Sequence, residues 1–152
     1  MDIIELRKLD DKFHRQALEC ILKTVEVSNS PDYLPSVIEY QLQTHYTMDW
    51  IRKQMRSRYF IVTLIEGKVV GTGSLDEDEI KAVFVDPSYQ RKGVGRAMLE
   101  EYARAMGLKE VMLKSSITAY DFYKRLDYRL VEKLSEEFQG DWVVTYLMKK
   151  RL

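Results

Sequence analysis

The sequence predicts an α/β protein in which helices flank one central mixed β-sheet. Two β-branched apolar runs within residues 59–75 flank Glu66-Gly67, and this pattern predicts a β-hairpin. A further apolar run at 80–85 leads through a short polar loop into an amphipathic helix at 94–106. Strands and helices that alternate in this way are typical of a sheet covered by helices.

The first third of the chain is expected to be mainly helical after a short opening strand. Apolar residues recur at helical spacing across 10–27, and two prolines within 28–36 predict a loop. A second helical region at 37–55 is interrupted near Thr47, where Thr47 or Asp49 would cap a new helix.

The second half of the chain is expected to add a strand at 110–116, a short helix at 118–126 and two final strands around the turn-like residues 139–141. Thr118 and Asp121 stand at the spacing of a capping box, which predicts the start of the short helix.

The helix at 94–106 has a suitable end signal in Gly107. The residues expected on its buried face are Val94, Met98, Tyr102 and Ala105. Its charged residues are expected mostly outside the core; they are Arg96, Glu100, Glu101 and Arg104.

Composition and charge favour a single folded domain at 1–152. Hydrophobic residues make up 45% and charged residues 32% of the chain, as in globular proteins. The 24 Lys+Arg balance the 24 Asp+Glu, and this neutrality argues against a nucleic-acid-binding protein. The basic cluster that could suggest such a role comprises Arg52, Lys53, Arg56 and Arg58.

The sequence gives no sign of a metal site, a disulfide or secretion. Cys20 is the only cysteine, and His14 and His45 lack the spacing of metal ligands. The first residues mix acids and bases and do not resemble a signal peptide, and no apolar run approaches membrane-spanning length. We therefore expect a metal-free protein in the cytoplasm.

The corner between the run at 80–85 and the following helix has the composition of an anion site. A helix start exposes unpaired backbone N–H groups, and its dipole adds partial positive charge. Gly93 and Gly95 carry no Cβ that would hinder an approaching phosphate, while Arg91, Lys92 and Arg96 add positive charge. The corner lacks the Walker and Rossmann glycine patterns, so neither type of nucleotide site is expected here.

The segment VFVDPSYQRKGVGRAML resembles the signature motif of the GCN5-related N-acetyltransferase (GNAT) family. That motif is a strand, a proline, (Gln/Arg)-x-x-Gly-x-(Gly/Ala) and a helix, and Gln90, Gly93 and Gly95 fit it. The segment AYDFYKRLDYRL is similar to the family's A-x-x-F-Y-x-x-x-G-F, and EGKVVGTGSL is like its central hairpin. The resemblance spans about 60–131.

The resemblance implies a sheet whose central strands separate and admit acetyl-CoA. The backbone of Phe84 and Val85 would pair with the pantetheine arm, and the N–H of Val85 would polarise the thioester carbonyl. No metal is implied. The implied cofactor-binding residues are Phe84, Val85, Gln90, Arg91, Lys92, Gly93, Val94, Gly95, Arg96 and Ser116.

Amine acylation needs a proton donor for the departing thiolate and a base for the amine. Tyr123 occupies the place of the family's tyrosine acid, on a helix whose buried face we expect to be Ala119, Phe122 and Leu126, which would leave the phenol half-buried. Glu79 is the best placed candidate base. It stands in an acidic turn with Asp76, Glu77 and Asp78, which could instead attract a cationic amine or simply be solvated.

Two positions depart from the family pattern. Ser116 stands where the family often has an asparagine that contacts the pantetheine, and a hydroxyl reaches less far. Asp127 stands in place of the glycine that follows the tyrosine helix, and aspartate tolerates the left-handed region better than most residues.

The acceptor remains open at this stage. It would be a small-molecule or peptide amine, bound near the aromatic residues Tyr33, Tyr40, Tyr46 and Trp50, which could equally belong to the core. A non-catalytic acyl-CoA-binding module is the alternative to an N-acetyltransferase. A longer acyl group and a homodimer are also compatible with the sequence, whereas nucleic acid and membrane partners are not expected.

Overall fold

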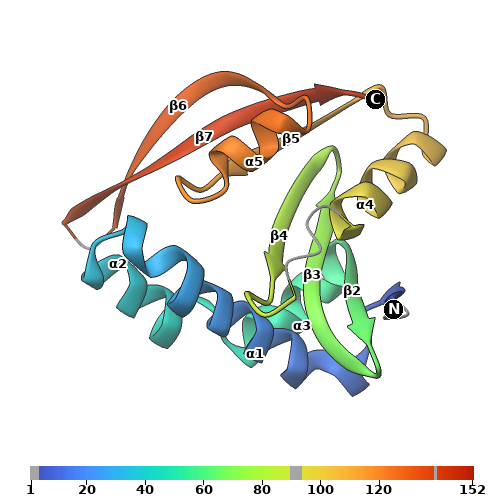
Figure 1. The fold of residues 1–152 in the computed structure, drawn as a ribbon, viewed down its shortest axis with the longest axis horizontal. Coiled ribbons are helices and arrows are strands. Elements are labelled where there is room, and N and C mark those ends of the chain that lie inside the picture. Colours follow the sequence, from blue (N-terminus) through green and yellow to red (C-terminus); the bar gives the residue numbers. More distant parts are fainter. Residues whose placement is uncertain (1–3, 90–93, 139) are drawn as a thin grey trace.

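The computed structural model describes residues 4–89, 94–138 and 140–152. Within these residues seven strands form one sheet in the order β1-β2-β3-β4-β5-β7-β6 (Figure 1). All neighbouring strands are antiparallel except β4 and β5, which are parallel, so the mixed sheet is confirmed. The strands are β1 Ile4–Lys8, β2 Tyr59–Ile65, β3 Lys68–Asp76, β4 Glu79–Val85, β5 Glu110–Ser115, β6 Arg129–Phe138 and β7 Asp141–Arg151.

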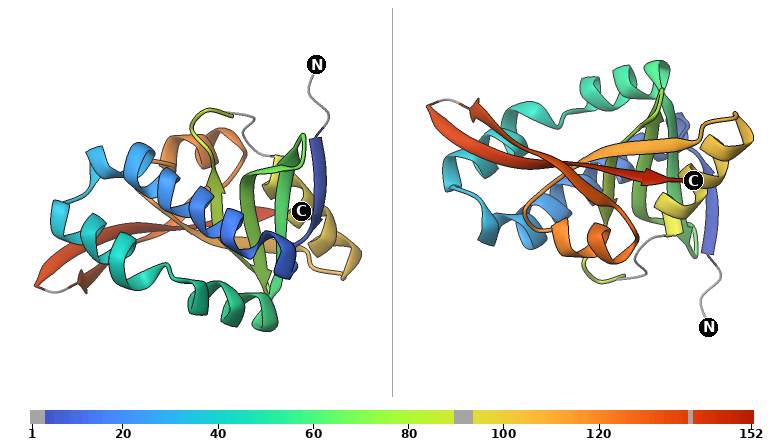
Figure 2. Two further views of the ribbon diagram at one scale, coloured as in Figure 1. Left: turned by 90° about the horizontal axis from the view of Figure 1, so that it is seen from below. Right: turned by 90° about the horizontal axis from the view of Figure 1, so that it is seen from above.

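Helices cover both faces of the sheet: α1, α2 and α3 lie on one side, α4 and α5 on the other (Figure 2). Within the described ranges, no helix is long and apolar enough to cross a membrane. The α-helices are α1 His14–Thr24, α2 Pro35–Tyr40, α3 Met48–Ser57, α4 Val94–Ala105 and α5 Tyr120–Arg125. Short turns of other helical types are η1 Asp11–Phe13, η2 Val25–Asn29, η3 Ser30–Asp32 and η4 Gln41–His45.

Strand β2 explains how the two layers of helices share one sheet. Side chains alternate between the faces of a strand, so Phe60 and Val62 pack with α1 and α3 while Ile61 packs with α4. All three are fully buried, because both faces of β2 are covered. This is why its sequence reads as a nearly continuous apolar run.

The predicted hairpin between β2 and β3 is confirmed. Ile65 pairs with Lys68, so the connection has two residues, Glu66 and Gly67, with φ of 51° and 76°. Positive φ at both central positions gives a turn whose twist matches that of the strands.

The N-terminal helices differ from expectation in their boundaries. Thr47 caps α3, as predicted, by accepting a hydrogen bond from the Trp50 amide at 3.1 Å. However, α2 begins at Pro35, inside the expected loop, because proline is well suited to the first turn of a helix.

The capping box expected at the start of α5 was wrong. Ala119 is the N-cap, and its amide donates to the Ser116 hydroxyl at 3.1 Å. The Thr118 hydroxyl instead donates to Asp32 at 2.7 Å. A partner 86 residues away in sequence therefore takes the hydroxyl that local spacing assigned to the helix.

The buried face predicted for α4 was also wrong. Met98 and Tyr102 are only partly buried and Ala105 is exposed. The residues that are buried are Arg96, Leu99, Glu100 and Ala103. Sequence patterning places charges outside the core, but here an arginine and a glutamate enter it as a pair.

Asp127 ends α5 in the left-handed region, with φ of 70°. The Tyr128 amide donates to the Tyr123 carbonyl at 3.1 Å, and the two rings are in contact at 5.5 Å. This is the Schellman arrangement, which usually has glycine at the left-handed position. Aspartate was expected to tolerate this conformation, and the structure confirms that it adopts it.

We expect Asp127→Gly to change the free energy of unfolding by no more than about 0.5 kcal/mol, because relief of the left-handed strain and the greater freedom of the unfolded chain oppose each other. Asp127→Val should lower it by about 1–2 kcal/mol, since a β-branched residue fits this region poorly. Urea denaturation of both variants measures the difference. Equal stability of the two would contradict the strain argument.

Candidate functional site

Strands β4 and β5 separate soon after they meet. They pair only at Glu79 with Met112 and Ile80 with Leu113, after which β4 diverges and β5 continues alongside β7 (Figure 1). A bulge accompanies the divergence, because Ala82 has φ of 55° and the register with β3 shifts there. The sheet is therefore open between its two middle strands.

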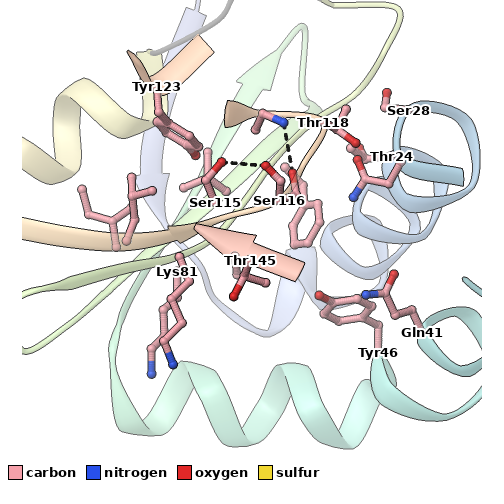
Figure 3. A pocket seen from close by; sticks show the side chains of 18 of the residues that line it. Thr24, Ser28, Gln41, Tyr46, Lys81, Ser115, Ser116, Thr118, Tyr123 and Thr145 are labelled. Carbon is pink, nitrogen blue, oxygen red and sulfur yellow. Dashed lines mark hydrogen bonds between the residues drawn. The ribbon is translucent and has the colours of Figure 1, made fainter. Parts of the chain in front are cut away.

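A cavity of about 860 Å³ lies at this opening (Figure 3). Its wall includes β4, the end of β5 with the loop to α5, and parts of α5, the N-terminal helices, β6 and β7. The sequence-predicted residues that line it are Glu79, Phe84, Val85, Ser116 and Tyr123, together with Tyr33, Tyr46 and Trp50. Segments distant in sequence thus meet around one space.

Side-chain hydroxyls compensate for the irregular backbone of β4. The Thr72 hydroxyl donates to the Ala82 carbonyl at 2.8 Å, next to the bulge. The Thr24 hydroxyl, from α1, lies 3.2 Å from the Val85 carbonyl and also lines the cavity. Sequence reasoning missed Thr24, because a threonine within a helical pattern gives no signal that it reaches a strand 61 residues away.

Four residues of the expected diphosphate corner lie outside the described residues: Gln90, Arg91, Lys92 and Gly93. Val94 begins α4, and Gly95 and Arg96 follow in its first turn, but neither Gly95 nor Arg96 is part of the cavity wall.

Gly95 and Arg96 are oriented differently from the sequence expectation. A Cβ at Gly95 would point toward the sheet, at an ordinary van der Waals distance of 3.7 Å from the Thr63 hydroxyl oxygen, so the packing of α4 has room for a side chain here. Arg96 is 8% exposed, and its guanidinium pairs with Glu100 instead of adding free charge to the corner.

Tyr123 is more buried than the sequence suggested. Tyr123 is 6% exposed, whereas Phe122 and Leu126 are only partly buried. The face of α5 that enters the core is therefore not the one expected from the sequence. Burial raises the pKa of the Tyr123 phenol to about 12, against the opposing effect of the Arg96 charge. Among the described residues no side chain bonds its hydroxyl, which Figure 3 shows directed toward Ser115 at the cavity wall.

Glu79 is the only member of the acidic tetrad that lines the cavity. Glu77 and Asp78 are exposed in the turn, as expected for a solvated loop. A carboxylate oxygen of Glu79 lies 4.0 Å from the ammonium of Lys81, which also binds Asp76 at 3.0 Å. The wall here carries charges of both signs.

Ser116 and the aromatic residues surround the opposite part of the cavity. The Tyr33 hydroxyl accepts a hydrogen bond from the Ile117 amide at 2.9 Å, next to Ser116. The ring of Tyr46 contacts those of Trp50 and Phe84 at 5.0 and 5.6 Å. Burial raises the pKa of Tyr46 to about 12, so its hydroxyl is a neutral hydrogen-bonding group. Tyr40 is not part of this wall.

An ion pair fixes the start of the loop that follows β4. The buried Asp86 carboxylate binds the Lys23 ammonium at 3.0 Å and accepts from the Ser88 amide at 2.8 Å. Burial alone would raise the pKa of Asp86, but these partners lower it. Lys23 and Asp86 were not singled out from the sequence, because a charged pair 63 residues apart leaves no local pattern.

Comparison with known proteins identifies the family. A sequence profile of the acetyltransferase (GNAT) domain matches residues 29–152. The chain belongs to the GNAT family. It is therefore an acetyltransferase, and the resemblance stated from the sequence motifs is confirmed.

Relatives of this acetyltransferase cover its full length. It is 28% identical over 149 residues to the uncharacterized N-acetyltransferase YafP of Escherichia coli (strain K12). The alignment covers 98% of this chain and 97% of YafP. A GCN5-related N-acetyltransferase of Rhodopseudomonas palustris superposes with a TM-score of 0.90 at 21% identity, covering 100% and 98% of the two chains. The structure of PaiA N-acetyltransferase of Thermoplasma acidophilum, in complex with coenzyme A, superposes with a TM-score of 0.78 at 17% identity, and the alignment covers 99% of each chain.

A buried ionic cluster joins three elements behind the site of the acetyltransferase. The carboxylate of Glu100, on α4, pairs with Arg96 and accepts from the Tyr128 hydroxyl at 2.9 Å and the Lys150 ammonium at 2.8 Å. Glu100 is 3% exposed. Since Tyr128 contacts Tyr123 at 5.5 Å, the cluster connects the start of α4 with the wall of the cavity.

We expect Glu100→Gln to lower the free energy of unfolding by about 3 kcal/mol, because it leaves the charges of the buried Arg96 and the partly buried Lys150 without their anion. Glu101→Gln is the matched control. The Glu101 side chain is 71% exposed, so its loss should cost no more than about 0.5 kcal/mol. Denaturation by urea measures both, and similar stability of the two variants would show that the buried cluster contributes little.

Proposed function

We propose that this acetyltransferase transfers the acetyl group of acetyl-CoA to a primary amine by direct attack, with Tyr123 as the general acid. The observation that carries the proposal is the unpaired edge of β4, which shares one cavity with the Tyr123 phenol. An edge of free backbone groups suits an extended, amide-bearing chain such as pantetheine. The similarity to a fold that was solved with coenzyme A is consistent with this assignment.

In this proposal the acetyl-CoA is held from two sides. The pantetheine arm runs along Phe84 and Val85, and Ser116 belongs to the wall of the same cavity. The diphosphate binds the backbone amides of 91–96 at the start of α4, where the helix dipole favours an anion. The pair formed by Lys23 and Asp86 positions the beginning of that loop.

The reaction is an acyl transfer in one displacement. The amine nitrogen attacks the thioester carbon, a C–N bond forms, and the C–S bond breaks. The N–H of Val85 stabilises the oxygen that gains negative charge. The thiolate takes the proton of the Tyr123 hydroxyl, and the amine gives up its proton through water or to Glu79. The products are an amide and free coenzyme A.

Direct attack also agrees with the position of the only thiol. Cys20 is buried in α1 and is not part of the cavity wall. Burial, followed by the nearby charge of Asp86, raises the pKa of its thiol to about 12. A protonated, buried thiol is a poor nucleophile, so a cysteine-bound acyl intermediate is not part of the proposed sequence.

Tyr123→Phe should reduce kcat by about 100-fold or more while changing the Kd for acetyl-CoA by less than about threefold, because the ring still packs but no proton is available. Thiol release under saturating substrates and calorimetric titration give the two values. Tyr120→Phe is the control, since Tyr120 lies on the same helix and outside the cavity wall. An unchanged kcat in Tyr123→Phe would exclude the acid role.

The rate should also depend on pH in a defined way. Because the pKa of Tyr123 is raised to about 12, its phenol stays protonated up to about pH 10. Activity should therefore rise between about pH 7 and pH 10, as more of the amine becomes neutral, without a falling limb due to Tyr123. A falling limb near about pH 9 that disappears in Tyr123→Phe would show that the phenol ionises much more easily.

A further inference from the structure

The cavity reaches both faces of the sheet. Tyr123 packs with the core that α4 and α5 cover on one face. Phe84, Tyr46 and Trp50 pack with the core on the other face, next to α1 and α3. All four residues line the cavity, and Figure 3 shows Tyr123 and Tyr46 at opposite sides of it. The gap between β4 and β5 thus connects a side that holds the proposed acid with a side that holds aromatic rings.

The proposed reaction assigns the acceptor to the second of these sides. The thiolate takes its proton from Tyr123, so the sulfur of acetyl-CoA lies toward α5. The amine nitrogen replaces this sulfur on the carbonyl carbon and therefore approaches that carbon from a different direction. The body of the acceptor then lies against residues of the N-terminal helices.

Three aromatic rings form a connected surface in this part of the wall. Phe84 stands next to Val85, where the proposed reaction takes place, and its ring contacts that of Tyr46 at 5.6 Å. Tyr46 in turn contacts Trp50 at 5.0 Å, and both contacts are T-shaped. Each of the three rings is only partly buried. Open aromatic surface in a cavity suits apolar and aromatic groups, and this surface begins beside the reacting atoms.

Charged side chains are directed away from the same part of the wall. From Thr24 to Trp50 the structure describes every residue, and those that line the cavity include no acid, lysine or arginine. The stretch is not poor in charge, because it contains Glu26, Asp32, Glu39 and Asp49. All of these are exposed and none lines the cavity. The wall here suits a ligand whose body is uncharged.

His45 adds a further ring to this surface. Its imidazole contacts the Tyr46 ring at 4.6 Å and lines the cavity. Burial lowers the pKa of His45, so the imidazole is neutral at neutral pH. Neutral, partly buried surroundings disfavour the ammonium form of an amine and favour the neutral form, which is the one that attacks.

The charged residues of the wall lie elsewhere and balance one another. They are Arg58, which follows α3, and the strand residues Glu79, Lys81, Lys114 and Glu136. Lys81 binds Asp76 at 3.0 Å and lies 4.0 Å from Glu79, and the charges of both carboxylates also act on Arg58. With Asp76 included, the cations and anions are equal in number, so this end of the wall offers no net charge that would select an acidic or a polycationic acceptor.

From these observations we propose that the acceptor is a primary amine with an uncharged aromatic body a few bonds from its nitrogen, and that the rings of Phe84, Tyr46 and Trp50 bind this body. The inference rests on the proposed function, because it names the class of the second substrate at the same site. The acyl transfer is as written above: the amine becomes an acetamide, coenzyme A leaves, and the aromatic ring is unchanged.

The wild-type enzyme provides the first test, with acetyl-CoA and a panel of primary amines. The panel comprises phenethylamine, cyclohexylethylamine, butylamine, 4-aminobutyrate and putrescine, and each concentration is expressed as the form with a neutral reacting nitrogen. Measured by thiol release, kcat/KM for phenethylamine should exceed that for the three amines without a ring by about tenfold or more, because the phenyl group buries more apolar surface. It should exceed that for cyclohexylethylamine by about threefold, because contact between aromatic rings adds to burial.

Variants of Tyr46 provide the second test. In Tyr46→Leu, the ratio of kcat/KM for phenethylamine to that for butylamine should fall about fivefold or more, because a ring of the wall is lost. Tyr46→Phe should keep most of this ratio, since it keeps the ring. Tyr59→Leu is the control, because the Tyr59 ring stacks on Tyr102 at 3.8 Å and lies outside the cavity wall. Circular dichroism and thermal melting establish that each variant is folded.

Binding without turnover can be measured through Trp50. The chain has two tryptophans, and Trp142 is 65% exposed and outside the cavity wall. Trp142→Phe therefore leaves Trp50 as the only tryptophan. In the presence of coenzyme A, phenethylamine should shift the Trp50 emission to shorter wavelengths in a saturable way, with a Kd about tenfold or more below that of butylamine.

The outcomes separate the two proposals. A saturable shift with phenethylamine, but no thiol release with any amine of the panel, would leave the aromatic site standing and reject acetyl transfer to such amines. Thiol release with any other member of the panel at least as fast as with phenethylamine would overturn the present inference and leave acetyl transfer standing. An unchanged ratio in folded Tyr46→Leu, or the absence of a saturable shift, would also overturn the inference. If Tyr46→Leu does not fold, the wild-type panel and the fluorescence titration decide.

Discussion

The site depends on the early separation of β4 and β5. A continuous sheet would satisfy the backbone groups of both strands, so a gap in its middle removes hydrogen bonds that the chain must replace. Strand β5 stays paired with β7 along its whole length, but on the edge that faces away from β4. On strand β4 the Thr72 hydroxyl bonds from the β3 side, next to the bulge, and the Thr24 hydroxyl lies 3.2 Å from the Val85 carbonyl. The other backbone groups on the facing edges of β4 and β5 are left to the cavity.

Charge in this molecule is used in two different ways. Glu100 binds Arg96, Lys150 and Tyr128 inside the core, so each buried charge has a partner and the cluster holds α4 against β7. At the cavity, the hydrogen bonds of Arg58 go to the neutral Ser74 and Gln54, and the charges of Asp76 and Glu79 act on it without direct contact. Removing two opposite charges from water is costly, and close pairing offsets that cost. Arg58 is only half-buried and keeps part of its hydration, so the charges of the two arginines are stabilised in different ways.

Much of the fold could be predicted from the sequence, because its signals are local. The Glu66-Gly67 turn, the Thr47 cap and the strand–loop–helix order around Asp86 each depend on a few neighbouring residues. The sequence motifs also pointed to the family that the profile match shows. Among the residues singled out from the sequence, Glu79, Phe84, Val85, Ser116 and Tyr123 line one cavity. Failures came from contacts between distant segments. The ion pair between Arg96 and Glu100 lies on the buried face of α4, where a charged pair was not expected. The Thr118 hydroxyl bonds Asp32 and does not cap α5. Lys23 and Thr24 gained their roles only through tertiary placement.

The separation of the strands has a consequence for motion in the free protein. Only two residue pairs, at Glu79 and Ile80, connect β4 with β5, so these strands form a narrow joint between two half-sheets. A molecule that bound in the gap would add contacts to both halves. Its binding energy would then add to the stability of the fold, so the rigidity of the protein would rise with the concentration of that molecule.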